Sequence, residues 1–416
     1  MQLIYKFQIH KENNKKLFFY FNEQCYYSAK LYNQTLYLIK IGLESKNYEN
    51  ISSLDKKLKS FDAEINFYRK LGKAQVSQQV IKLAQKSYQC YFKSLSSYRK
   101  NKSKFHGKPK EPKEIKKLLL IYTNQCSKIK DGNIYLSKNL SIKIPQYEIY
   151  KDKIKNYKQI RIVPKGIYYN IEIVYLDDTI INEELIENKY ASIDLGINNL
   201  CSLFLENEYP ELISGKDIKS VNYFYNKSKG KFKSFKNNLY KTKLFKLERF
   251  RDNYINDKFH KISRYIIQRL IKLKIGTLVI GYNQGWKDSI SMGRKGNQKF
   301  AYIPYYKLIS MLLYKCNLCG IKVQITEESY TSKCSSLDNE SIEKHDSYLG
   351  KRIYRGLFKL SSGKFINADI NGAINILRKC KGDEVIKDIL PACLGFLFNP
   401  KKIRILWIKL FLNNSI

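Results

Sequence analysis

Acidic residues are scarce in this chain. Its 37 Asp and Glu stand against 76 Lys and Arg, which gives the 416 residues a formal net charge of +39. Such an excess repels itself unless a polyanion neutralises it, and nucleic acid is the polyanion that this charge favours. A coding bias toward Lys, Asn, Ile and Tyr could supply part of the lysine, but that bias should raise Glu nearly as readily. The charge therefore predicts binding to nucleic acid.

Regularly spaced cysteines and long apolar runs are also missing. The nine cysteines are an odd number without regular spacing, which argues against a disulfide framework and favours a reducing, intracellular context. No stretch approaches the ~20 apolar residues that a membrane span needs. The first residues lack the basic start and apolar core of a signal peptide. We therefore expect a soluble cytoplasmic protein with no membrane partner.

The first half of the chain changes its hydrophobic pattern twice. Residues 2–9 alternate apolar and polar side chains as a strand does, and residues 17–99 then show helical spacing. A basic loop at 100–113, interrupted by Gly and Pro, is either a solvated linker or a segment that contacts a nucleic-acid backbone. Residues 118–176 return to short alternating segments. This order predicts a small β-domain with a helical insertion.

The second half alternates short apolar runs with helical patterns, as expected of a chain that is too long for one core. The expected strands are the run that carries Asp194 and residues 201–205, 211–215, 277–282 and 321–326. The expected helices are a basic region that reaches residue 273, a helix at 304–319 and a late helix that begins near Asp369. Candidates for the buried side of the basic region are Phe245, Phe250, Tyr254, Ile262 and Ile266.

Carboxylates at three places could share one site, and those of Asp194 and Asp369 have apolar or small neighbours, where a surface acid is not expected. Asp194 lies in Ser-Ile-Asp-Leu-Gly, Glu327 and Glu328 follow a strand, and Asp369 lies in Ala-Asp-Ile-Asn-Gly-Ala. A buried carboxylate is costly to desolvate unless a cation binds it. Two Mg²⁺ ions held by such oxygens can activate water and stabilise the leaving oxygen of a phosphodiester. The residues alone leave a metal-dependent nuclease and a non-catalytic nucleic-acid binder equally open.

Four motifs follow one another in the second half of the chain. They are Ser-Ile-Asp194-Leu-Gly-Ile-Asn-Asn-Leu, Glu328-Ser-Tyr-Thr-Ser-Lys333, Arg355-Gly-Leu-Phe and Ile-Asn-Ala-Asp369-Ile-Asn-Gly-Ala-Ile-Asn-Ile. In this order they resemble the motifs of the TnpB (OrfB) family of transposon-encoded, RNA-guided nucleases, which are related to type V CRISPR effectors. The similarity is strong over 185–380 and weaker in the N-terminal half.

The resemblance implies an α+β multi-domain fold with an N-terminal β-barrel, called a wedge, that holds a helical recognition insertion, followed by a ribonuclease H-like (RuvC) α/β nuclease domain. The implied boundaries are 1–16 and 100–180 for the wedge, 17–99 for the insertion, 185–380 for the nuclease domain with a helical hairpin at 217–273, and 381–416 for a C-terminal tail.

The implied activity is that of an RNA-guided, Mg²⁺-dependent DNA endonuclease of an insertion sequence, working with two ions in the prokaryotic cytosol. Its partners would be a guide RNA and double-stranded target DNA. The alternative is a catalytically inactive, nucleic-acid-binding regulator or transposition accessory protein.

The resemblance gives Asp194 and Asp369 the roles of first and third metal-binding acids. Most members carry the second acid after the strand that here ends at Gly281, which offers no carboxylate. A subset of the family supplies it from the strand before Tyr-Thr-Ser-Lys, where this chain has Glu327 and Glu328. Consecutive strand residues face opposite ways, so one of the two should point into the site. Glu328 is favoured because it adjoins the motif, and Glu327 is the alternative.

Many relatives carry paired Cys-x-x-Cys zinc knuckles after the Thr-Ser-Lys motif, whereas here Cys334 is the cysteine that remains. Cys316 and Cys319 have the spacing of half a zinc site, but they lie near the end of an expected helix. Cys334 with His345 could complete a set of ligands. We expect buried or free thiols rather than a zinc site.

Basic side chains in three segments are candidates for contacts with nucleic acid, because lysines interleaved with aromatic rings can bind phosphates beside stacked bases. The alternative for any one of them is a solvated surface position. The candidates are Lys104, Lys108, Lys110, Lys229, Lys231, Lys233, Lys333, Arg352 and Arg355.

Overall fold

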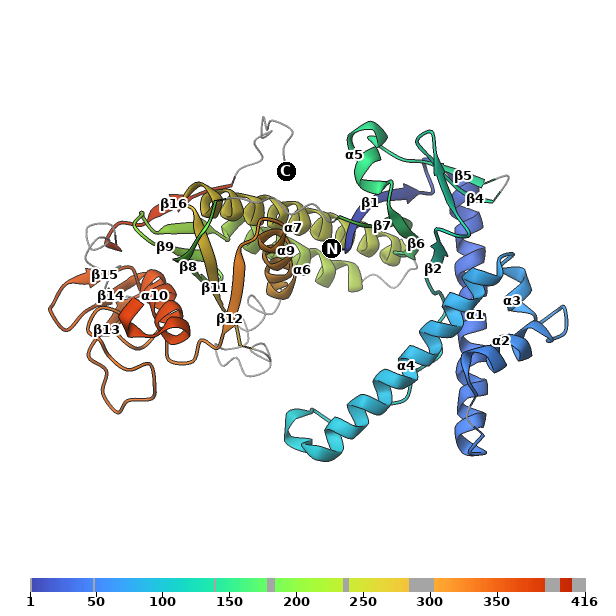
Figure 1. Ribbon diagram of the computed structural model, residues 1–416, viewed down its shortest axis with the longest axis horizontal. Helices are drawn as coiled ribbons and strands as arrows, with labels where there is room; N and C mark the ends of the chain where they lie inside the picture. Colours follow the sequence, from blue (N-terminus) through green and yellow to red (C-terminus); the bar gives the residue numbers. More distant parts are fainter. Residues whose placement is uncertain are drawn as a thin grey trace. The chain divides into compact units, whose positions relative to one another are not determined.

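The structure is a computed structural model that describes residues 2–47, 49–137, 140–177, 184–234, 239–283, 303–385 and 397–405. Residues 386–396 and 406–416 of the predicted C-terminal tail lie outside these ranges. The chain divides into two compact units, Met1–Asp178 and Thr179–Ile416 (Figure 1). In the described ranges, every helix is too short or too polar to cross a membrane.

Unit 1 contains two antiparallel sheets. The larger has the order β1-β7-β6-β2, formed by β1 (Gln2–His10), β7 (Tyr168–Leu176), β6 (Tyr157–Pro164) and β2 (Leu120–Thr123). The smaller joins β3 (Lys128–Lys130), β4 (Asn133–Ser137) and β5 (Leu140–Lys143), and α5 (Tyr147–Ile154) follows it. Asp131 and Gly132 connect β3 to β4 with positive φ at both residues, as a tight hairpin turn requires. The strand predicted at the N-terminus is confirmed.

Four helices separate β1 from β2, where the sequence predicts helical spacing. They are α1 (Lys15–Glu44), α2 (Ile51–Lys59), α3 (Phe67–Lys70) and α4 (Ala74–Lys100). The side chains of Asn14, Asn50 and Asn66 cap the first three by accepting a backbone N–H three residues ahead. The apolar sides of these helices share one core with both sheets. Residues 101–113 hold a single short 3₁₀ turn, Lys102–Lys104, as their Gly and Pro content predicts.

Unit 2 is built on a mixed six-stranded sheet of order β12-β11-β8-β9-β10-β16. Its strands are β8 (Ile186–Leu195), β9 (Asn199–Leu205), β10 (Glu211–Ser214), β11 (Ile275–Gly281), β12 (Lys322–Thr326) and β16 (Lys401–Ile403). The pairs β8–β9 and β9–β10 are antiparallel, whereas β11 is parallel to both β8 and β12. The predicted strands around Asp194 and at 201–205, 211–215, 277–282 and 321–326 are confirmed.

Side chains alternate between the two faces of this sheet. Leu278 and Ile280 enter the core beneath α6 (Lys216–Lys233), α7 (Leu239–Lys272) and α9 (Tyr305–Leu318). Val279 enters a second core beneath α10 (Ala368–Lys381). Unit 2 therefore has three layers, with α10 on the face opposite α7 (Figure 1). Between β12 and α10, a small antiparallel sheet joins β13 (Lys351–Tyr354), β14 (Leu357–Lys359) and β15 (Phe365–Ile366).

The buried side of α7 was predicted only in part. Ile262 and Ile266 are buried as predicted, but Phe245 and Phe250 are exposed, so that prediction was wrong. The residues of α7 from Ile255 onward pack beneath the sheet, whereas earlier residues face α6. Helical spacing shows which positions share a face of a helix, but it does not show how far along the helix its partner extends.

Glu211 on β10 provides a stability test for this layer. The side chain is 2% exposed, and its carboxylate accepts hydrogen bonds of 2.8 Å from Arg269 Nε and from the Tyr265 hydroxyl on α7. Removing the Glu211 carboxylate takes away two buried hydrogen bonds and leaves Arg269 with Glu208, 3.3 Å away, as its carboxylate partner. We therefore expect Glu211→Ala to lower the free energy of unfolding by about 2 kcal/mol in urea denaturation.

The matched control is Glu184→Ala, because Glu184 pairs with Lys274 at the surface and is 91% exposed. That change should leave unfolding unaltered. Equal effects of the two substitutions would contradict a stabilising role for the Glu211 pair.

Candidate functional site

Two acids meet at one edge of the unit 2 sheet. Asp194 is the penultimate residue of β8, and it alternates with Ile193 and Leu195, which point toward α7 and α9. Its side chain therefore faces the α10 layer. Because β8, β11 and β12 are parallel, their carboxyl ends lie at the same edge, and Glu328 follows β12 there. The chain crosses over from β11 to β12 through α9, and this connection places Glu328 next to Asp194.

The third acid comes from the first turn of α10. Asn367 caps this helix by accepting hydrogen bonds from the backbone N–H groups of Asp369 and Ile370. The helix packs closely on β8, where the Ser192 hydroxyl donates to the carbonyl of Ala373 at 2.6 Å. A Cβ at Gly372 would lie 2.7 Å from Asp194 Oδ2, so only glycine permits this approach. The packing brings Asp369 beside Asp194.

The two neighbouring glutamates face opposite ways. One oxygen of the Glu328 carboxylate, Oε2, is buried without a hydrogen-bond partner. Glu327 is instead 61% exposed, and its carboxylate pairs with Lys379 Nζ at 2.8 Å. The structure therefore brings Glu328 to Asp194 and leaves Glu327 at the surface.

Gly281, at the end of β11, explains the position of Glu328. A Cβ on Gly281 would lie 2.4 Å from Ile376 Cδ1 and 3.0 Å from Glu328 Oε2. Ile376 and the carboxylate of Glu328 therefore fill the space in which a side chain at 281 would begin. In this packing, an acidic side chain at position 281 and the side chain of Glu328 would need the same space, so the site can hold only one of them.

Burial and mutual repulsion shift the pKa values of the two inner acids. Burial, and then the charge of Asp369, raise the pKa of Asp194 to about 7. Burial, and then the charge of Asp194, raise the pKa of Glu328 to about 8. Both effects oppose the charged form, and a bound cation would relieve both.

The Asp369 carboxylate has polar partners at both oxygens. Arg352 Nη2 contacts Oδ1 at 3.1 Å, and Asn199 Nδ2 donates to Oδ2 at 2.8 Å. Among the residues that the structure describes, no three His, Cys, Asp or Glu side chains form a group that could hold one metal ion. The unpaired Glu328 oxygen and the raised pKa values nevertheless fit a hard divalent cation shared with Asp194. Asp369 could join them if Arg352 released it.

Two features of this site differ in how clearly the sequence shows them. The glycine and alanine after Asp369 predict close packing of the late helix, and Gly372 allows α10 to reach Asp194. Asn199, which orients Asp369, was not recognised as functional, although it stands inside the first quoted motif.

The cysteines considered as zinc ligands lie in two different segments of unit 2. Cys316 and Cys319, at the end of α9, are buried in the apolar core beneath the sheet. Cys334 is buried in a different segment, with its thiol 3.7 Å from the carbonyl of Glu343. His345 is half-buried, and its Nε2 lies 2.8 Å from the carbonyl of Ser341.

The basic candidates differ in their surroundings. Arg352 contacts Asp369, Lys229 lies over the ring of Tyr225, and Lys333 lies 5.8 Å from the ring of Tyr348. The side chains of Lys104 and Lys233 lie outside the described residues. The exposed candidates are Lys108, Lys110, Lys231, Lys333, Arg352 and Arg355.

The raised pKa of Glu328 predicts how stability depends on pH without metal. A carboxyl whose pKa is higher in the folded chain than in the unfolded chain stabilises the fold at low pH, and that contribution is lost as pH rises through the folded pKa. Glutamine never carries the charge. At about pH 8 with a chelator present, Glu328→Gln should therefore unfold with a free energy about 2 kcal/mol higher than the parent chain, and near pH 5 the two should converge.

The control for this titration is Glu327→Gln, because the hydrogen bond from Lys379 lowers the pKa of Glu327. It should show no gain in stability at about pH 8. A gain from Glu328→Gln that is independent of pH would rule out ionisation as the cause.

Two family models match the chain. The OrfB_IS605 model, described as a probable transposase, matches residues 172–287, and the TNB domain model of the Cas12f1-like proteins matches residues 305–376. The TnpB-like protein ORF457 of Acidianus two-tailed virus is 24% identical over 227 residues, which are 52% of this chain and 47% of the relative. The endodeoxyribonuclease Cas12f1 of Sulfoacidibacillus thermotolerans is 34% identical over 119 residues, which are 28% of this chain and 25% of the relative.

The matched segments thus span about half the length of the first of these relatives and a quarter of the second. A solved Cas12f1–sgRNA–target DNA complex contains a chain that matches with a TM-score of 0.53 and 17% identity, over 86% of this chain and 82% of that chain. This likeness shows a shared mixed α+β multi-domain fold. The matches to the OrfB_IS605 and TNB models and to the two relatives show that residues 172–287 and 305–376 are similar to TnpB and Cas12f1 proteins.

Proposed function

We propose that this protein is an RNA-guided DNA endonuclease of the TnpB type, encoded by an insertion sequence, in which unit 2 is a ribonuclease H-like (RuvC) nuclease domain. Asp194, Glu328 and Asp369 are its metal ligands. The observation that carries the proposal is the buried, unpaired oxygen of Glu328 at the sheet edge that also holds Asp194. A cation bound between these two carboxylates would offset their repulsion and favour their ionised forms.

The strand order supports the nuclease domain. Three antiparallel strands, β8 to β10, are followed by β11, which pairs with β8, and by β12, which pairs with β11; both run parallel to β8. The first acid stands on β8, the central strand of this arrangement. In unit 1, the β1-β7-β6-β2 sheet and the helices α1 to α4 would serve as the wedge and the recognition region.

Each residue has a role that follows from its position. When bound, two Mg²⁺ ions would supply a Lewis acid and an activated water for phosphodiester hydrolysis. Asp194 and Glu328 would bind them in the ionised form that their surroundings now oppose. Asn199 would keep Asp369 oriented, and Arg352, once released from Asp369, would be free to contact a phosphate.

Charge supports the choice of partners. The net charge of +39 suits a protein that holds both a guide RNA and double-stranded target DNA. One structural relative is a complex with an sgRNA and a target DNA. The protein would handle the heteroduplex through its backbone, while base pairing selects the target.

The activity is tested by purifying the chain with RNA co-expressed from its flanking sequence. The bound RNA is sequenced, and a library of matching DNA targets is incubated with the complex and Mg²⁺. We expect cleavage by the parent complex and none by Asp194→Ala, which should retain the RNA. Binding of RNA and DNA without cleavage by the parent would instead favour the alternative, a non-cleaving regulator or transposition accessory protein.

The second acid is tested by a matched pair of substitutions. Glu328→Ala should lower the cleavage rate about a thousandfold or more, because it removes a ligand of the metal ions. Glu327→Ala removes an exposed carboxylate that pairs with Lys379 and should only weaken cleavage. Cleavage rates of the two complexes at saturating Mg²⁺ decide between them, and the reverse order of effects would reject Glu328 as the ligand.

A further inference from the structure

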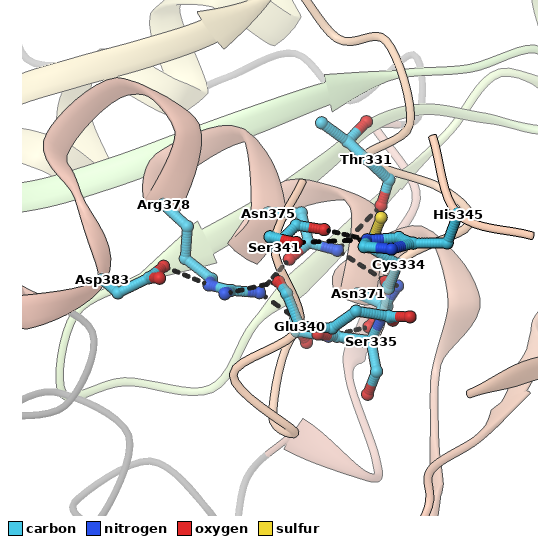
Figure 2. Close-up of polar contacts among 11 residues, drawn as sticks. Thr331, Cys334, Ser335, Glu340, Ser341, His345, Asn371, Asn375, Arg378 and Asp383 are labelled. Carbon is cyan, nitrogen blue, oxygen red and sulfur yellow. Dashed lines mark hydrogen bonds and ion pairs between the residues drawn. The ribbon is translucent and has the colours of Figure 1, made fainter. Parts of the chain in front are cut away.

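Residues 331–349 follow Glu328, and this is the part of the chain for which the resemblance to the TnpB family implies zinc knuckles. In this chain, three polar side chains of α10 hold the start of that segment (Figure 2). They are Asn371, Asn375 and Arg378, whose exposure is 0%, 0% and 3%. Spacings of four and three residues place them on one face of the helix. Burial of so many polar groups is costly unless each has partners.

The two asparagines bind the backbone of the segment. Asn375 Nδ2 donates to the carbonyl oxygens of Thr331, at 2.9 Å, and Cys334, at 2.7 Å. Asn371 Nδ2 donates to the same Cys334 carbonyl at 2.9 Å, and its Oδ1 accepts from the N–H of Ser336 at 2.9 Å. Figure 2 shows both amides directed at this turn. Side-chain amides thus satisfy backbone groups that no strand or helix pairs here.

Arg378 extends the network across the segment. Its Nη1 donates to the Ser335 carbonyl at 3.1 Å and to Asn375 Oδ1 at 2.9 Å, and its Nη2 donates to the Glu340 carbonyl at 2.8 Å. Its Nε pairs with Asp383 Oδ1 at 2.8 Å, which compensates the buried charge. Partners at all three nitrogens hold the guanidinium in one orientation.

The Glu340 carboxylate joins the beginning of the segment to its end. One oxygen accepts the N–H of Ser335 at 2.5 Å, and the other accepts the N–H of Leu349 at 2.8 Å. Glu340 is 5% exposed, so these bonds replace the water that it has lost. The Glu340 carboxylate therefore cross-links Ser335 and Leu349, which lie fourteen residues apart in the chain.

The network reaches the second acid through Thr331. The Thr331 hydroxyl donates to the backbone carbonyl of Glu328 at 2.8 Å, and the Thr331 carbonyl is the acceptor of Asn375. Asn375 lies on the same helix as Asp369. One rigid element, α10, therefore holds Asp369 through its first turn and Glu328 through a chain of hydrogen bonds.

We propose that Asn375 and Arg378 are positioning residues that fix Glu328 against Asp194, with the α10 network cross-linking the segment in place of a metal knuckle. The part that concerns metal binding rests on the proposed function. Asn375 is suited to the role because its NH₂ group serves two carbonyls at once. An isosteric carboxylate would have no donor and would repel both.

The test compares the full chain, free of nucleic acid, with Asn375→Asp, Arg378→Lys and the control Asn222→Ala. Asn222 is also a buried asparagine of unit 2, 4% exposed, but it serves Arg251 on α7 and not this segment. Hydrogen exchange of the amides from Glu328 to Ser336 reports the cross-link. Mn²⁺ titration followed by electron paramagnetic resonance reports the acids, and thermal melting reports overall stability.

We expect Asn375→Asp to speed exchange in this segment and to weaken Mn²⁺ binding about tenfold, as loss of a group that orients a ligand does. Arg378→Lys keeps the charge but not the planar fork, so it should show a smaller effect of the same kind. Asn222→Ala should lower the melting temperature without either change. A zinc chelator should leave exchange in the parent chain unaltered.

Three results would overturn the proposal. The first is faster hydrogen exchange in the parent chain after zinc chelation, and the second is unchanged exchange in Asn375→Asp. The third is faster exchange in Asn375→Asp with unchanged Mn²⁺ affinity, which would mean a purely structural role. If the parent itself bound no Mn²⁺, the proposed function would fail, while the exchange data would still decide whether α10 cross-links the segment.

Discussion

The close approach of α10 to the end of β8 is the constraint on which the site depends. Gly372 leaves room for Asp194 Oδ2, and the Ser192 hydroxyl ties β8 to the backbone of the helix. Any larger side chain at 372 would push the helix away from β8, because its Cβ would lie 2.7 Å from Asp194 Oδ2. Asp369 would move away with the helix, and so would the three side chains that hold the segment after Glu328.

This arrangement brings repelling carboxylates together, which is electrostatically unfavourable. Asp194 and Glu328 are buried near one another, and each is harder to ionise than in water. A fold selected for stability alone would not place them so, because replacing one with an uncharged residue removes the repulsion. Arg352 offsets part of the charge through Asp369. These features are typical of a binding site for cations, and the basic side chain beside it is that of Arg352.

Much of the fold could be predicted from local patterns. Alternation gave the strands around Asp194 and after it, and glycine with proline marked the loop at 101–113, since these depend on neighbouring residues only. Phe245 and Phe250 show the limit of such local patterns. Both are exposed, and the sequence of α7 does not show how far along the helix the covering layer extends. The buried network of Asn371, Asn375 and Arg378 shows it again, since its acceptors are backbone groups of a segment about forty residues away.

The sequence by itself determined the basic charge, the order of the motifs and the three places from which acids come, because composition and spacing are properties of the chain. Only the tertiary structure decided between Glu327 and Glu328 as the neighbour of Asp194. Two adjacent residues cannot be told apart by periodicity when both follow the end of a strand. Gly281 leaves a space at the end of β11, and Ile376 and the carboxylate of Glu328 fill it.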